Sequence, residues 1–119
     1  MNESEINEIL KIISKRYNLE IMNHLIINDK IIVLFNLLSE EVIAQKIKMN
    51  ENVLCFDLQS NLVWQMEFIK RFNDDTPIVG MEFLNQSLKV FDWAGEYFIL
   101  DIKTGKIIDS GRGKGIRPW

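Results

Sequence analysis

Apolar positions follow two different periods along the chain, and the change falls near residue 19. Over residues 4–17 the apolar side chains recur at helical spacing, with charged residues on the rest of the helical wheel. Asn2 with Glu5 three residues later favours an N-terminal capping box, and Asn18 suits a left-handed helix end. The pattern therefore predicts an amphipathic helix over residues 4–17. Its apolar stripe is Ile6, Ile9, Leu10, Ile13 and Tyr17.

From Leu19 onward, β-branched and aromatic residues stand in short runs separated by polar, turn-forming residues, which predicts four hairpins. The paired runs are 19–27 with 30–37, 52–58 with 62–68, 78–84 with 87–92, and 96–102 with 106–109. Residues 39–50 fit a short helix, an edge strand or a loop, and 70–77 hold two acids and a proline, as expected of a surface loop. Residues 110–119, with three glycines, are interpreted as a tail.

These elements predict a single, mainly β domain over residues 1–119. Two consecutive four-stranded antiparallel meanders, residues 19–68 and 78–109, follow the N-terminal helix, and each has the outline of a propeller blade.

One segment of the chain is nearly repeated. Residues 54–64 and 98–108 align without a gap and lie 44 positions apart. Each aspartate, Asp57 or Asp101, ends a strand and can accept hydrogen bonds from turn amides, as can the Ser60 or Thr104 hydroxyl. Asn61 and Gly105 would supply the left-handed residue of a bulged hairpin. Both acids are therefore assigned to turn structure rather than to acid–base chemistry, and Gly95 is assigned to a further turn.

The second copy resembles the repeat of pyrroloquinoline-quinone β-propellers, in which an aspartate is followed by Thr-Gly and then by an apolar residue or tryptophan. Trp64 fills that last position in the first copy and Ile108 in the second. Two blades do not close a ring, so no quinone cofactor is expected.

The stretches 52–57, 63–66, 79–81 and 93–107 also resemble a group of small bacterial proteins that share a phenylalanine–aspartate segment and a tryptophan–glycine segment ending in Leu-Asp-x-x-Thr-Gly-Lys-Ile. Some of these proteins are toxin immunity proteins. The resemblance implies a β-rich fold and a role in binding a cognate toxin.

Composition and charge narrow the possible classes of protein and its expected location. The chain has 119 residues, is 47% hydrophobic and carries a formal charge of −3, which argues against a general nucleic-acid binder. Cys55 is the only cysteine and stands in an apolar run, so a buried thiol in a reducing compartment is expected. The N-terminus lacks the pattern of a secretory signal and no apolar run would span a membrane, so a cytoplasmic location without membrane contact is expected.

The sequence does not predict an enzyme. His24 is the only histidine and alternates with apolar neighbours, as a structural imidazole would. One cysteine and one histidine do not make a closed zinc site, so neither metal nor cofactor is expected.

Protein binding is the expected function. Loop acids would face a cationic partner, Trp93 would either pack locally or meet that partner, and a tail cation would add a contact. The candidate residues are Asp74, Asp75, Asp92, Trp93, Glu96 and Arg112. The leading hypothesis is an immunity protein that neutralises a cognate toxin. The alternative is a small ligand-binding or assembly module, with homodimerisation through an unpaired sheet edge as one form of it.

Overall fold

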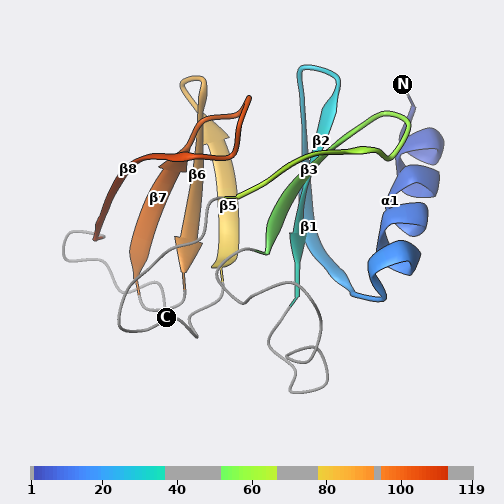
Figure 1. Ribbon diagram of the computed structural model, residues 1–119, viewed down its shortest axis with the longest axis horizontal. Helices are drawn as coiled ribbons and strands as arrows, with labels where there is room; N and C mark the ends of the chain where they lie inside the picture. The colour runs from blue at the N-terminus through green and yellow to red at the C-terminus, as the bar shows by residue number, and fades with distance from the viewer. Residues whose placement is uncertain (1, 37–51, 67–77, 93–94, 113–119) are drawn as a thin grey trace.

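A computed structural model of the chain describes residues 2–36, 52–66, 78–92 and 95–112. Helix α1 (Glu3–Tyr17) precedes two four-stranded antiparallel sheets in which every strand pairs with its neighbour in sequence. The first sheet contains β1 (Ile21–Ile27), β2 (Lys30–Phe35), β3 (Val53–Asp57) and β4 (Leu62–Gln65). The second contains β5 (Ile78–Leu84), β6 (Ser87–Asp92), β7 (Glu96–Leu100) and β8 (Ile107–Arg112). The predicted fold class is confirmed (Figure 1).

Helix α1 has the ends that its sequence predicts. The Asn2 side chain accepts a hydrogen bond from the Glu5 N–H at 2.9 Å, which satisfies one of the free amides of the first turn. Asn18 follows the helix in the left-handed conformation, with φ of 56°, and its N–H donates to the Ser14 carbonyl.

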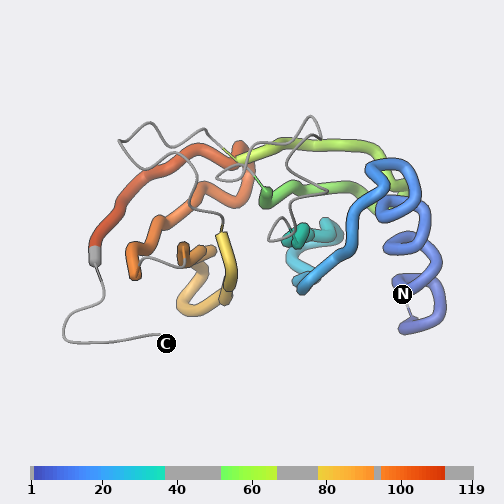
Figure 2. Tube along the Cα trace, turned by 90° about the horizontal axis from the view of Figure 1, so that it is seen from below, coloured from blue at the N-terminus to red at the C-terminus, as the bar shows by residue number. Residues whose placement is uncertain are grey.

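The molecule has three layers, with α1 on one face of the first sheet and the second sheet on the other (Figure 2). Strand alternation produces this arrangement, because Ile31, Val33 and Phe35 face the helix while Ile32 and Leu34 face the second sheet. The Tyr17 ring lies with its centroid 5.2 Å from that of Phe35, at the end of the helix. Strand β2 is therefore buried on both sides, as its uninterrupted apolar run predicts.

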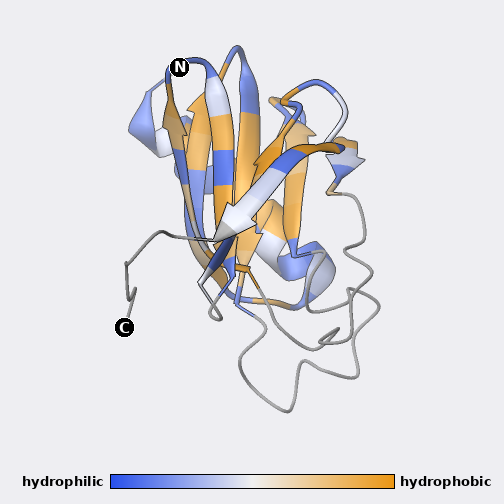
Figure 3. Cartoon of the chain, turned by 90° about the vertical axis from the view of Figure 1, so that its left-hand side faces the viewer, coloured by the Kyte–Doolittle hydropathy of each residue, from blue (hydrophilic) through white to orange (hydrophobic). Residues whose placement is uncertain are grey.

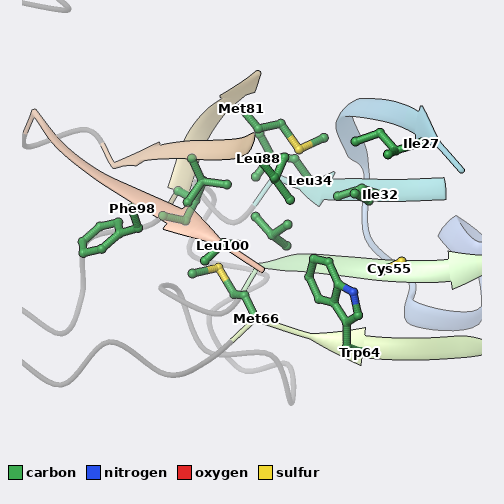
Figure 4. Close-up of a cluster of buried hydrophobic side chains, with 13 residues drawn as sticks. Ile27, Ile32, Leu34, Cys55, Trp64, Met66, Met81, Leu88, Phe98 and Leu100 are labelled. Carbon is green, nitrogen blue, oxygen red and sulfur yellow. The ribbon is translucent and has the colours of Figure 1, made fainter. Parts of the chain in front are cut away.

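The main core lies between the two sheets (Figure 4). Cys55 and Trp64 of the first sheet and Leu88 and Leu100 of the second are among its members, and each is at most 6% exposed. Complete burial of an aliphatic side chain of this size contributes about 1.5–3 kcal/mol. This contact between the sheets therefore contributes strongly to the stability of the sandwich.

A buried amide joins the sheets at the ends of the strands away from the hairpin turns. Asn52 is fully buried, and its Nδ2 donates to the carbonyls of Phe35 (2.7 Å) and Ile78 (2.9 Å). Its Oδ1 accepts from the Ile78 N–H at 3.1 Å. Because one side chain satisfies backbone groups of β2 and β5, it fixes where the second sheet begins relative to the first.

The turns that join β1 to β2, β3 to β4, β5 to β6 and β7 to β8 lie at one end of the molecule, at the top of Figure 1. The two-residue turns Asn28–Asp29 and Asn85–Gln86 have positive φ at both residues, between 50° and 65°. This is the backbone that suits the right-handed twist of a hairpin, and Asn and Asp tolerate it well. The predicted tips of the first and third hairpins are confirmed.

Strand β8 extends beyond the predicted limit of residue 109 and ends at Arg112. Gly111 pairs with Tyr97, whose hydroxyl lies 2.6 Å from the position that a Cβ at residue 111 would take. The glycine thus belongs to a strand in which it leaves room for a ring, and the interpretation of residues 110–112 as tail is wrong. The segments 39–50 and 70–77 lie outside the described residues.

The two outer faces of the sandwich differ. The first sheet presents an apolar face to α1, whereas the second presents a mixed one, on the side viewed in Figure 3. There the Lys89 ammonium lies over the rings of Tyr97 (4.4 Å from the centroid) and Phe91 (5.3 Å). This cation–π contact covers aromatic surface on the outer face of the second sheet. On the first sheet, α1 covers the corresponding face.

Candidate functional site

The turn between β3 and β4 is the first copy of the repeated segment. Asp57 Oδ1 accepts hydrogen bonds from the N–H groups of Gln59 and Asn61, both at 2.9 Å, and Oδ2 accepts from the Asn61 side chain at 3.2 Å. The backbone N–H of Asn61 is the largest cause of a lowered pKa for Asp57, because it stabilises the carboxylate. The predicted turn role of Asp57 is confirmed.

The turn between β7 and β8 is the second copy. Asp101 Oδ1 accepts from the Lys103 N–H at 2.8 Å, and the Thr104 hydroxyl accepts from the Lys106 N–H at 3.2 Å. Gly105 takes the left-handed conformation, with φ of 76°. The three turn assignments in this copy are therefore confirmed, and so is Gly95, with φ of 93°.

The gapless alignment of the two copies is wrong after the aspartates. Three residues separate the paired Asp57 and Asn61, whereas four separate Asp101 and Lys106. The left-handed residue of the first turn is consequently Ser60, with φ of 65°, and not Asn61. Beyond the turns, Cys55 pairs with Trp64 and Ile99 pairs with Asp109, so Asp109 rather than Ile108 occupies the place of Trp64.

Each turn is held by a side chain from the preceding layer. Arg16 of α1 donates to the Ser60 carbonyl at 2.5 Å and to its hydroxyl at 2.8 Å. Trp64 of β4 donates from Nε1 to the Ile102 carbonyl at 2.8 Å. The indole also covers Gly105, where a Cβ would lie 2.4 Å from Cε3. Only glycine fits this contact between the sheets.

Beside this contact is a cavity of about 240 Å³, here called the seam pocket. Its lining comes from the first hairpin, from β4 and from the second repeated turn: Ile27, Asn28, Lys30, Ile32, Val63, Ile102 and Lys103. The aliphatic side chains form an apolar surface, while the two ammonium groups and the Asn28 amide are polar. This combination of an apolar lining and a few polar groups is typical of a binding pocket.

The charge of the seam pocket is positive. Lys30 pairs with Asp57 across β2 and β3, and its charge contributes to the lowered pKa of that carboxyl, after the hydrogen bonds from Asn61 and Gln59. Lys103 is exposed and lies on the opposite wall, in the second sheet. The pocket therefore has two lysines: Lys30 is close to Asp57, and Lys103 lies on the other wall, away from that acid.

The acidic surface expected for partner binding is only partly described. Asp92 is fully buried, because strand alternation turns it inward with Leu88 and Val90, and its Oδ1 accepts from the Glu96 N–H at 2.9 Å. Its assignment to an exposed acidic cluster is thus wrong. Glu96 is half-buried, at the start of β7.

The remaining predicted binding residues give less information. Asp74, Asp75 and Trp93 lie outside the described residues, as does the side chain of Arg112, whose backbone pairs with Glu96.

The Cys55 thiol and the His24 imidazole were the other groups considered for chemistry. Burial raises the pKa of the Cys55 thiol to about 11, so it is protonated at neutral pH. His24 is half-buried on the edge strand β1. Within the ranges given above, no three His, Cys, Asp or Glu side chains are placed to share a metal ion. The same ranges contain no helix with the length and apolarity needed to cross a membrane.

Sequence reasoning missed the residues of the seam pocket. The sequence predicts Lys30, Val63 and Ile102 as strand residues and Lys103 as a turn residue, with no binding role for any of them. Trp64 was the available signal, because a tryptophan on a short edge strand whose other apolar side chains are exposed needs a partner elsewhere for its N–H.

The chain belongs to a family described as a domain of unknown function (DUF7957), whose sequence model matches residues 1–112. No curated protein matches the chain.

Proposed function

We propose that this protein is a protein-interaction module that binds and neutralises a cognate bacterial toxin. The observation that carries the proposal is the gathering of four tight turns at one end of the sandwich, where residues of two of them line the seam pocket. Turns held on a rigid scaffold are a common place for recognition, because the scaffold fixes their positions before a partner arrives.

The surface beside these turns offers apolar contacts. Leu62 is 48% exposed and Val63 is 43% exposed, next to each other at the start of the edge strand β4. Their neighbours are fixed, since Arg16 holds the first repeated turn and Trp64 holds the second. A partner that covers both side chains would gain their burial at little cost in ordering.

The neutralising role is supported by the sequence resemblance to small bacterial proteins that include toxin immunity proteins. The match covers β3, β4, part of β5 and most of the hairpin of β7 and β8, and so includes two of the four turns. A direct test begins with the reading frame next to the gene. If that frame encodes a toxin, co-expression of this chain is expected to restore growth and the two proteins are expected to co-purify.

Matched variants test the surface. Leu62→Lys places a charge among the turns, and Ile12→Lys places the same charge on α1, where the side chain is 49% exposed, nearly the same as Leu62. Both should fold, as judged by circular dichroism. Leu62→Lys is expected to abolish rescue and co-purification while Ile12→Lys retains both. Rescue by the Leu62 variant at the wild-type level would contradict this choice of surface.

Assembly through a sheet edge is the second candidate, because β4 and β8 each pair with one strand only among those described. Light scattering after size-exclusion chromatography distinguishes self-assembly from toxin binding, because it measures the mass of the protein alone. A dimer that dissociates on the Leu62→Lys change, without any toxin partner, would favour assembly.

A further inference from the structure

We infer that the seam pocket binds a compact apolar monocarboxylate, a small molecule with a short aliphatic or aromatic body and one carboxylate group. The pocket shares Val63 with the surface proposed for toxin binding, but this inference does not rest on that proposal.

The lining selects for an apolar body. Ile27, Ile32, Val63 and Ile102 supply aliphatic surface from both sheets. The volume of about 240 Å³ equals that of about eight water molecules at roughly 30 Å³ each. A ligand of about that many non-hydrogen atoms would displace water from apolar walls, and displacement of such water is favourable.

The charges select for one negative group. Lys30 and Lys103 line the pocket, and neither forms an ion pair with any residue in the described ranges. Asp57 is the nearest acid to Lys30 in the strand register, but its carboxylate is already bonded to three donors of its own turn. With Lys30 partly balanced by Asp57 and no ion pair of Lys103 among the described residues, the pocket has a small positive excess, which matches a monoanion better than a dianion.

The walls are built before a ligand arrives. The backbone of Ile102 is held because its carbonyl accepts from Trp64, and the backbone of Lys103 because its N–H donates to Asp101. On the other wall, Ile27 and Lys30 pair directly across the tight Asn28–Asp29 turn. A ligand therefore meets a pocket whose lining residues come from elements already tied together, which lowers the entropic cost of binding.

Hexanoate is a suitable probe because it has eight non-hydrogen atoms and one carboxylate. We expect saturable amide shifts of the full-length ¹⁵N-labelled chain, concentrated at Lys30, Val63 and Ile102–Lys103, at millimolar hexanoate. Hexanol has the same body without the charge, and hexylamine has the opposite charge. Hexanol is expected to bind at least about fivefold more weakly and hexylamine not at all. Equal binding of hexanol, or shifts centred on another part of the chain, would overturn the inference.

Three variants locate the site. Lys103→Gln is expected to weaken hexanoate binding about fivefold, and added salt should weaken it in the wild type but less in this variant. Lys106→Gln is the matched control, because Lys106 is exposed in the same turn but does not line the pocket. Val63→Phe fills the pocket from a side chain that is 43% exposed, so the fold should persist while binding is lost. Unchanged affinity in both Lys103→Gln and Val63→Phe, with native spectra, would also refute the site.

Discussion

The two repeated turns begin alike and end differently. In both, an aspartate at the end of a strand accepts turn amides, but the first turn has three residues and the second has four. Ser60 occupies the left-handed position in one and Gly105 in the other. The first turn lies under an arginine and the second under an indole, and this difference accounts for the choice of residue. Ser60 offers its hydroxyl to Arg16, whereas Gly105 must leave room for Trp64.

The comparison shows what the repeat does in this fold. Each repeated turn receives hydrogen bonds from the layer before it, the first from α1 and the second from the first sheet. The turns are therefore the points at which successive layers are placed in register. At the position equivalent to Trp64 the second sheet has Asp109, which is exposed, so the same indole contact is not offered to a further layer.

The largest loss of unfolding free energy is expected from a substitution at Gly105. Gly105→Ala places a methyl group 2.4 Å from Trp64 Cε3 in a residue with φ of 76°. The left-handed conformation costs about 1 kcal/mol and the overpacking about 2 more, so a loss of about 3 kcal/mol in unfolding free energy is expected. Urea denaturation measures it. Ser60→Ala is the control at the equivalent turn position, and a loss there as large as at Gly105 would show that the two turns do not differ in packing.

Trp64→Phe removes the indole N–H while retaining a ring. The Ile102 carbonyl then loses its donor in a partly buried place, and the smaller ring leaves a gap in the core, so we expect a loss of about 2 kcal/mol. The amide signals of residues 102–105 should shift while those of the first turn do not. Equal shifts in both turns would indicate a general loosening of the sandwich.

The sequence was sufficient to predict the layout of strands and helix because local signals agree with the fold. Asn28–Asp29 and Asn85–Gln86 tolerate positive φ, Asn2 caps the helix, and an apolar run marks β2. Strand β8 was predicted too short because Gly111 has no strand propensity of its own, and its place is set by the Tyr97 ring on the neighbouring strand. A contact between neighbouring strands, such as that of Gly111 with Tyr97, cannot be predicted from the local pattern of apolar and polar residues.

The site was harder to predict, for a related reason. The one-residue slip between the repeated turns depends on which side chain covers each of them, and Arg16 and Trp64 lie 44 and 38 residues away from the groups they contact. The seam pocket likewise combines side chains from both sheets. Asp92 illustrates the opposite error, since an acid beside a predicted turn suggested exposure although strand alternation buries it.

The contact of Arg16 with Ser60 should contribute less to stability than the contact of Trp64 with Ile102 and Gly105. Arg16→Met retains the aliphatic stem and removes both hydrogen bonds to Ser60. Because the contact is only partly buried, a loss of about 1 kcal/mol is expected. A double-mutant cycle with Ser60→Ala measures how much of it passes through the hydroxyl. No coupling between the two changes would mean that Arg16 acts through the carbonyl alone.

The smallest effect on stability is expected from the charge of Asp57, a partly exposed turn residue, and it appears only in acid. The N–H of Asn61, followed in effect by the Asn61 side chain and the Gln59 N–H, lowers the pKa of the folded carboxyl below that of the unfolded chain. A lowered pKa means that the stabilising contribution is complete above the unfolded value, about 3.9, and is lost as the pH falls through the folded value. Asp57→Asn retains one acceptor oxygen and cannot titrate. Urea midpoints measured from neutral pH down to about pH 2 should therefore converge for the wild type and the variant as the solution becomes acidic. A gap between them that stays constant over this range would show that the turn depends on the shape of the side chain and not on its charge.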